Sequence, residues 1–162
     1  MKRLGFDNVR NENQDFYKLI DADNLPEHDI LMTNPPYSDD HIDRLLRFLS
    51  THDKPFCLLM PNWVARKRNF KELLTRSVFY LSPFTPYTYT MPPWNERPDH
   101  VGTDGATTPY LSSWYISFRN NQEEQEKLME QLNKVRQNDW VVAKTIKGVK
   151  WKIQKLAKKQ SK

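Results

Sequence analysis

The stretch Asp29-Ile30-Leu31-Met32-Thr33-Asn34-Pro35-Pro36-Tyr37 decides how the fold of this chain is interpreted. The apolar run from Ile30 to Met32 predicts a strand that is buried on both faces of a parallel sheet. Two consecutive prolines fix φ and exclude a helix, so a stiff loop must follow this strand. Ligands of open α/β sheets bind at the carboxyl ends of strands, which is where this loop is expected to lie.

Strand-like and helix-like segments alternate on both sides of this stretch. Upstream, Asp15-Phe16 is expected at the end of an earlier strand. Downstream, apolar residues recur at i, i+3, i+4 and i+7 from Ile42 to Leu49, which predicts a helix capped by Ser38 or Asp39. The further elements expected are strands at 56–60, 78–81, 87–90 and 111–118, a basic helix at 64–76, and a helix capped by Asn120 that ends near 137. This alternation favours an α/β fold with a mostly parallel sheet.

Composition places the chain among folded proteins of the cell interior. Its 162 residues suffice for a core, and its 12% aromatic content exceeds what disordered chains carry. We expect no membrane span and no export signal, hence a location in the cytoplasm, nucleus or mitochondrion. The single cysteine, Cys57, is expected to be buried in a strand, and the four scattered histidines predict no metal site.

The positive charge is concentrated at the C-terminus. Eight of the 25 basic residues are lysines between Lys144 and Lys162, where no acid occurs, so the other 143 residues carry 17 basic and 20 acidic side chains. Such a segment is typical of chains that bind phosphate backbones, although it also solubilises proteins. We therefore expect two parts, an α/β domain at 1–119 and a helical extension with a lysine-rich tail at 120–162.

The tetrapeptide Asn34-Pro35-Pro36-Tyr37, directly after an apolar strand, resembles the catalytic motif of the S-adenosylmethionine (SAM) dependent amino-group methyltransferases. These enzymes modify N6 of adenine or the side-chain amide of glutamine. The order strand, motif, helix, strand, helix and terminal strands is similar to the second half of their Rossmann-like fold, over about residues 6–119. The resemblance implies SAM as the cofactor and the four motif residues as the catalytic site. The alternative interpretation is a proline-stiffened loop with no catalytic role.

The chemistry of amino-group methylation accounts for these residue types. An exocyclic amino group is a poor nucleophile, because its lone pair is delocalised. Two acceptors on its two N–H bonds, the Asn34 side-chain oxygen and the Pro35 carbonyl, would direct the lone pair at the methyl donor. Tyr37 would stack on a base swung out of its strand.

The cofactor-binding half of the family pattern is only partly matched. In the family, an acidic residue followed by an aromatic residue contacts the adenine of SAM, and Asp15-Phe16 match in type and approximate position; the alternative for Asp15 is a structural cap. The family's glycine-containing loop has no counterpart, because Gly5 alone among the four glycines precedes the motif. Three interpretations of this difference stay open: a protein partner completes the SAM site, a further N-terminal segment of a longer chain completes it, or the chain is a short form that has lost cofactor binding.

Basic and aromatic residues favour a nucleic-acid substrate, RNA or DNA, over protein glutamine. The candidate nucleic-acid-binding residues are Arg66, Lys67, Arg68, Trp94, Arg97, Lys150, Lys152 and Lys155. Two alternatives stay open: a glutamine-amide methyltransferase, and a non-catalytic methyltransferase-like module that binds nucleic acid or protein.

Overall fold

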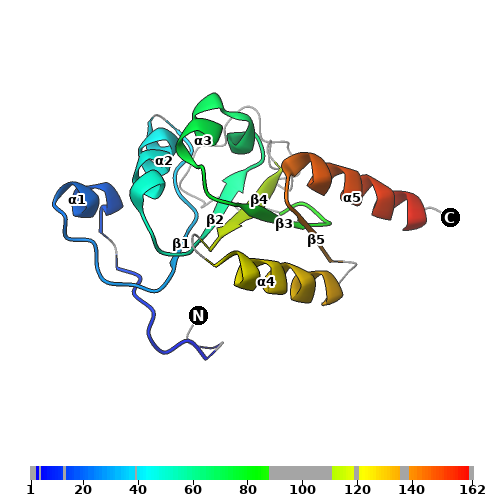
Figure 1. The fold of residues 1–162 in the computed structure, drawn as a ribbon, viewed down its shortest axis with the longest axis horizontal. Coiled ribbons are helices and arrows are strands. Elements are labelled where there is room, and N and C mark those ends of the chain that lie inside the picture. The colour runs from blue at the N-terminus through cyan, green and yellow to red at the C-terminus, as the bar shows by residue number, and fades with distance from the viewer. Residues whose placement is uncertain are drawn as a thin grey trace, which may run out of the picture.

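Five strands form one mixed sheet in the computed structural model, which describes residues 3, 5–12, 14–38, 40–87, 111–118, 121–135 and 139–160. The strands lie in the order β1-β2-β4-β3-β5 (Figure 1). Their bounds are β1 Leu31–Thr33, β2 Phe56–Pro61, β3 Phe79–Pro83, β4 Ser112–Ser117 and β5 Trp140–Ala143. The helices are α1 Phe16–Asp21, α2 His41–Thr51, the 3-10 helix η2 Val64–Arg66, α3 Arg68–Leu73, α4 Gln122–Lys134 and α5 Ile146–Gln160.

The directions of the strands correct the expectation of a mostly parallel sheet. β1 and β2, joined by α2, are parallel, whereas β4 is antiparallel to both of its neighbours, β2 and β3, and β5 is antiparallel to β3. The α/β class is confirmed, but the sheet is mostly antiparallel. β4 is buried along most of its length because it lies inside the sheet between β2 and β3, as an interior strand of a parallel sheet would be.

Helices cover both faces of the sheet. One row of neighbours, Leu58, Tyr115, Tyr80 and Ala143, runs across β2, β4, β3 and β5 and belongs to the larger buried cluster, to which α2, α3 and α5 also contribute. The opposite face packs against Met129 of α4. Figure 1 shows α4 on one side of the sheet and α2, α3 and α5 on the other. The core thus has three layers.

The strand before the proline motif is exposed on one face, contrary to the expectation of burial on both. Ile30 is 45% exposed and Met32 is 47% exposed, whereas Leu31 packs against the larger cluster. β1 is the last strand of the sheet and pairs with β2 alone. The apolar run therefore forms an edge strand with an open face, not an interior strand.

The lysine-rich C-terminal segment is a helix that contributes to the core rather than a tail. β5 pairs with β3, and α5 buries Ile146 and Val149 completely or nearly so. Lys152 of α5 donates a hydrogen bond of 2.6 Å to the Val142 carbonyl of the edge strand β5. Residues 140–160 therefore share the sheet and core of the preceding strands.

The other helices depart from the expected bounds by small amounts. α2 buries Ile42, Leu45, Leu46 and Leu49, as their spacing predicts, but its N-cap is Asp40. The expected helix at 64–76 is divided into η2 and α3. α4 is capped by Asn121, whose side chain accepts a hydrogen bond of 3.0 Å from the Glu124 amide. Over the described parts of the chain, every helix is too short or too polar to cross a bilayer.

Candidate functional site

The Asn-Pro-Pro-Tyr loop lies at the carboxyl end of β1, as expected. Asn34 and Pro36 are exposed, Pro35 is buried, and Tyr37 is partly buried against the larger cluster. Because β1 and β2 are parallel, their carboxyl ends meet at the same edge of the sheet. The loop therefore lies beside the turn that follows β2.

Tyr37 joins the motif to the neighbouring strand. Its hydroxyl is within hydrogen-bond reach of the Asn34 side-chain oxygen and lies 3.0 Å from the carbonyl oxygen of Leu59 in β2. This hydroxyl therefore holds the side chain of Asn34 while the Tyr37 ring packs inward. The structure thus gives Tyr37 a positioning contact that the sequence did not predict, beside the stacking role expected of its ring.

The turn after β2 is held by a buried polar cluster that the sequence did not reveal. Ser113 of β4 donates a hydrogen bond of 2.6 Å to Oδ1 of buried Asn62, and its oxygen lies 3.0 Å from that of Ser82. The Tyr115 hydroxyl donates to the Pro61 carbonyl at 2.8 Å and accepts from the Ala65 amide at 3.2 Å. Burial raises the pKa of Tyr115, so it stays a neutral donor. β4 thereby fixes the path of the chain from β2 into η2.

Asp15 and Phe16 do not end a strand, so that expectation is wrong. Asp15 is the N-cap of α1, and its Oδ1 accepts hydrogen bonds from the amides of Tyr17 at 3.0 Å and Lys18 at 3.3 Å. Phe16 packs edge-on against Phe48 of α2, with ring centroids 5.5 Å apart. The cap explains the acidic residue physically, because it satisfies two amides at the helix start that lack an intrahelical acceptor.

A small cavity lies between the N-terminal segment and the open face of β1. It has a volume of about 230 Å³ and is lined by Phe16, Ile30 and Met32, with Arg10 and Glu12 at one side. Pockets for small-molecule ligands and cofactors commonly have volumes of about 300–1,000 Å³. The apolar wall suits an adenine ring, but the described residues do not by themselves enclose a molecule as large as SAM.

The three consecutive basic residues 66–68 face different partners. Lys67 pairs with Asp43 of α2 at 2.7 Å, and Arg68 pairs with Glu72 at 2.7 Å within α3. The hydrogen bonds from Lys67 and Asn69 lower the pKa of Asp43 below its ordinary value. Arg66 instead lines a cleft together with Lys150. The structure thus brings together two predicted binding residues that are far apart in the sequence.

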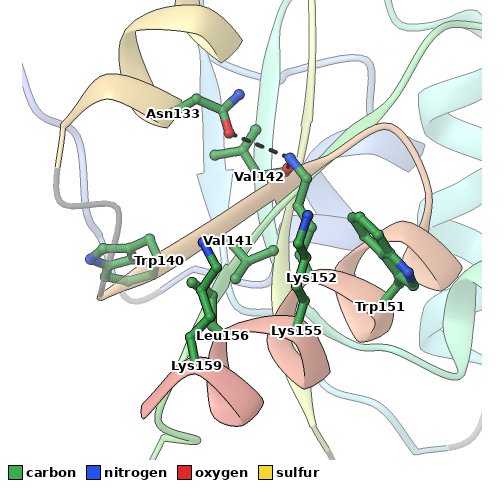
Figure 2. Close-up of a pocket in the computed structure, with 9 residues that line it drawn as sticks. All are labelled: Asn133, Trp140, Val141, Val142, Trp151, Lys152, Lys155, Leu156 and Lys159. Carbon is green, nitrogen blue, oxygen red and sulfur yellow. Dashed lines mark hydrogen bonds between the residues drawn. The ribbon is translucent and has the colours of Figure 1, made fainter. Parts of the chain in front are cut away.

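Lys152 and Lys155 lie on another side of α5, away from that cleft. They line a hollow of about 360 Å³ that is bounded by Trp140 of β5 and Trp151 (Figure 2). The Lys155 ammonium lies 4.9 Å from the centre of the Trp151 ring. The other two predicted residues, Trp94 and Arg97, lie outside the residues that the structure describes.

Other reactive side chains in the described parts of the chain offer no second site. Burial raises the pKa of Cys57 in β2 to about 11, so its thiol is protonated and unreactive near neutral pH. Among the described histidines, cysteines and carboxylates, no three come close enough to hold a metal ion. Within the described residues, the proline motif and the basic surfaces beside α5 are therefore the candidate sites. In comparisons with known proteins, the chain matches no family model, no curated protein and no solved structure.

Proposed function

We propose that this chain carries the amino-group-binding half of a SAM-dependent N6-adenine methyltransferase that acts on nucleic acid. The supporting observation is the place of Asn34-Pro35-Pro36-Tyr37 at the carboxyl end of β1, with Asn34 exposed and its side-chain oxygen in contact with the Tyr37 hydroxyl. An exposed, oriented amide oxygen beside a stiff proline loop is what recognition of an amino group requires.

In this proposal the chain acts by positioning. Asn34 Oδ1 accepts one N–H of the adenine amino group and the Pro35 carbonyl accepts the other. The Tyr37 hydroxyl has one proton and two acceptors in reach, so it can donate to Leu59 when Asn34 receives the substrate. Because no charged general base takes part, the reaction does not depend on a residue with a perturbed pKa.

SAM would supply the methyl group from its sulfonium sulfur, which would keep the electrons of the broken sulfur–methyl bond, and the methylated amino nitrogen would release one proton to water. The small cavity beside Phe16 and Met32 offers an apolar wall for part of such a molecule. We propose that a protein partner or a further N-terminal segment completes the SAM site. The open edge of β1, with its exposed Ile30 and Met32, is suited to receive that addition.

Two features favour adenine in nucleic acid over the glutamine amide. Arg66 and Lys150 face the same cleft, and η2, which carries Arg66, follows the strand next to the motif. A protein glutamine would require no such concentration of positive charge. The glutamine-amide activity remains the alternative for the same Asn34 and Pro35 acceptors.

A non-catalytic role is the second candidate. The small volume of the cavity beside β1 favours it, because a chain unable to enclose SAM could still bind through its basic surfaces. Thermal unfolding with and without SAM separates the two roles for the isolated chain. SAM at 100 times its dissociation constant would add about 2.7 kcal/mol to the folded state, whereas a binding module would show no shift.

The direct test is methyl transfer by the tagged chain captured from its own cells with its bound partners. Radiolabelled SAM would be supplied with an adenine-containing oligonucleotide, the same oligonucleotide already methylated at every adenine N6, or a glutamine peptide. We expect label in the first substrate alone, its loss in Asn34→Ala, and normal transfer in the control Asn8→Ala, which changes an exposed residue upstream of α1 that does not line the cavity beside β1. No label from the captured wild-type complex, or full activity in Asn34→Ala, would overturn the proposal.

A further inference from the structure

A basic cleft of about 620 Å³ lies between η2, α3 and the beginning of α5. Five cationic side chains line it: Arg66, Lys71, Lys144, Lys147 and Lys150. Its apolar part comes from Phe70, Tyr80 and Ile146, each of which is buried in the body of the protein. The cleft therefore has a rigid base and a positively charged lining.

Most of this charge is not balanced by carboxylates of the described residues. Lys144 pairs with Glu126 at 3.2 Å, but among the described side chains no acid forms an ion pair with Arg66, Lys71, Lys147 or Lys150. The neighbouring Lys67 and Arg68 show the contrast, because each pairs with an acid at 2.7 Å. Unpaired cations from three elements facing one cleft repel one another and attract a polyanion.

An exposed tryptophan stands next to this cleft. Trp151 is 58% exposed and lies one turn of α5 beyond Lys147, on the same side of the helix. Its ring also borders the hollow of Figure 2, where Lys152 and Lys155 lie between Trp140 and Trp151 in the view. An exposed indole between two groups of lysines combines a stacking surface for a base with cations for the phosphates beside it.

We propose that the basic cleft and Trp151 form a binding site for single-stranded nucleic acid, with phosphates between Arg66 and Lys150 and a base stacked on the indole. A single strand is favoured because an indole can stack only on a base face that no neighbouring base covers, and in a duplex the adjacent base pairs cover these faces. Such stacking tolerates any base. This inference deepens the proposed function by naming where the substrate strand is held. It rests on the proposed function at one point: the bound polyanion is taken to be a nucleic acid because that function has a nucleic-acid substrate.

The cleft is connected to the motif through the sheet. The Tyr115 hydroxyl ties the Pro61 carbonyl at the end of β2 to the Ala65 amide in η2, directly before Arg66. The end of β2 lies at the same sheet edge as the motif after β1. A strand held in the cleft would therefore have its neighbouring nucleotides directed along the edge that carries Asn34.

The test measures binding of a fluorescent 20-nucleotide RNA, the same sequence as DNA, and its duplex, by anisotropy over a range of salt concentrations and without SAM. Each phosphate contact to a single strand contributes about 0.7 to the slope of log affinity against log salt. The double variant Arg66→Gln/Lys150→Gln should therefore lower the slope by about 1.4. The control Lys18→Gln/Lys127→Gln removes the same charge from exposed positions on α1 and α4 and should leave the slope nearly unchanged.

Trp151→Leu tests the stacking part separately. We expect it to weaken single-strand binding by about tenfold or more while leaving the salt slope unchanged, because stacking involves no counterion release. Among the described side chains, Lys127 is the one substituted residue that forms an ion pair, an exposed i,i+4 pair with Glu123. All the substituted side chains are exposed, so thermal unfolding should match the wild type. Tighter binding of either single strand than of the duplex would support the site, and the single strand with the higher affinity, RNA or DNA, would be its preferred ligand.

Three results would overturn the inference: an unchanged slope in the Arg66/Lys150 double variant, an equal loss in the control double variant, or duplex binding as tight as single-strand binding. If binding follows the expected pattern but the captured complex transfers no methyl group, the proposed function fails while the binding site stands. If methyl transfer occurs but the double variant binds normally, the binding site fails while the proposed function stands.

Discussion

The hydroxyl of Tyr37 lies 3.0 Å from the carbonyl oxygen of Leu59, and so connects the loop after β1 to the middle of β2. The same hydroxyl reaches the side-chain oxygen of Asn34. Because it carries a single proton, it donates fully to one acceptor at a time. Tyr37 therefore both anchors the motif to the sheet and orients its amide.

The Tyr37→Phe variant tests this relationship. Loss of the hydroxyl should lower the free energy of unfolding by about 0.5–1.5 kcal/mol, the usual net value of one hydrogen bond. Urea denaturation of the wild type, Tyr37→Phe, Asn34→Ala and the double variant would give the coupling between the two side chains. Strictly additive effects would show that the Tyr37 contact with Asn34 contributes nothing to stability.

The packing of α5 leads to a second prediction. Val149 is fully buried in the larger cluster, so Val149→Ala should lower the free energy of unfolding by about 1–3 kcal/mol. The change Lys158→Gln on the exposed side of α5 should alter it by less than about 0.5 kcal/mol. Chemical denaturation measures both. If Val149→Ala were as harmless as Lys158→Gln, the lysine-rich segment would be a solvated tail after all.

The side chain of Arg76 connects three segments of the chain, a role that the sequence did not predict. Its guanidinium donates to the carbonyls of His52 at 3.0 Å and Lys54 at 3.1 Å and to Oγ of Ser117 at 2.9 Å, and lies 4.7 Å from the centre of the Phe56 ring. Arg76→Met should therefore cost about 2–4 kcal/mol of stability, since hydrogen bonds from a charged donor are the stronger kind. Arg76→Lys should restore little of this loss, because an ammonium cannot reproduce the planar fork. If Arg76→Lys were as stable as the wild type in a denaturation experiment, the hydrogen bonds from the planar guanidinium would not be responsible for the stability.

Stability should fall in mildly acidic solution because of His52. Burial, together with neighbouring His28, lowers the pKa of His52 from 6.5 to about 4. The two rings meet through their Nε2 atoms at 3.1 Å. Between about pH 6.5 and pH 4 the unfolded chain binds a proton at this position that the folded chain does not, so the free energy of unfolding decreases as the pH is lowered through this window.

The variant His52→Gln provides the comparison. Its free energy of unfolding should depend less on pH between 6.5 and 4 than that of the wild type, because glutamine does not titrate. Guanidinium denaturation at several pH values measures this difference. Parallel curves for the two proteins would mean that His52 is not the group responsible.

Local patterns predicted some elements well and others poorly, for physical reasons. The spacing of Ile42, Leu45, Leu46 and Leu49 predicted α2, because one helix face meets the core whatever the topology. The same reasoning failed for Asp15, since an acid before an aromatic residue is compatible both with a strand end and with a helix cap. It also failed for Ile30 and Met32, whose exposure depends on whether another strand lies beside β1.

The sequence by itself determined the strand before the proline motif, the stiff loop Asn34–Tyr37 and the helix that follows, because each depends on dihedral limits and on residues a few positions apart. Only the tertiary structure decided that β4 returns antiparallel between β2 and β3, that α5 completes the core, and that Arg66 and Lys150 face one cleft. The direction of strand pairing and the meeting of distant cations follow from how buried surfaces pack together. That packing is a property of the whole folded chain, which no short segment of the sequence contains.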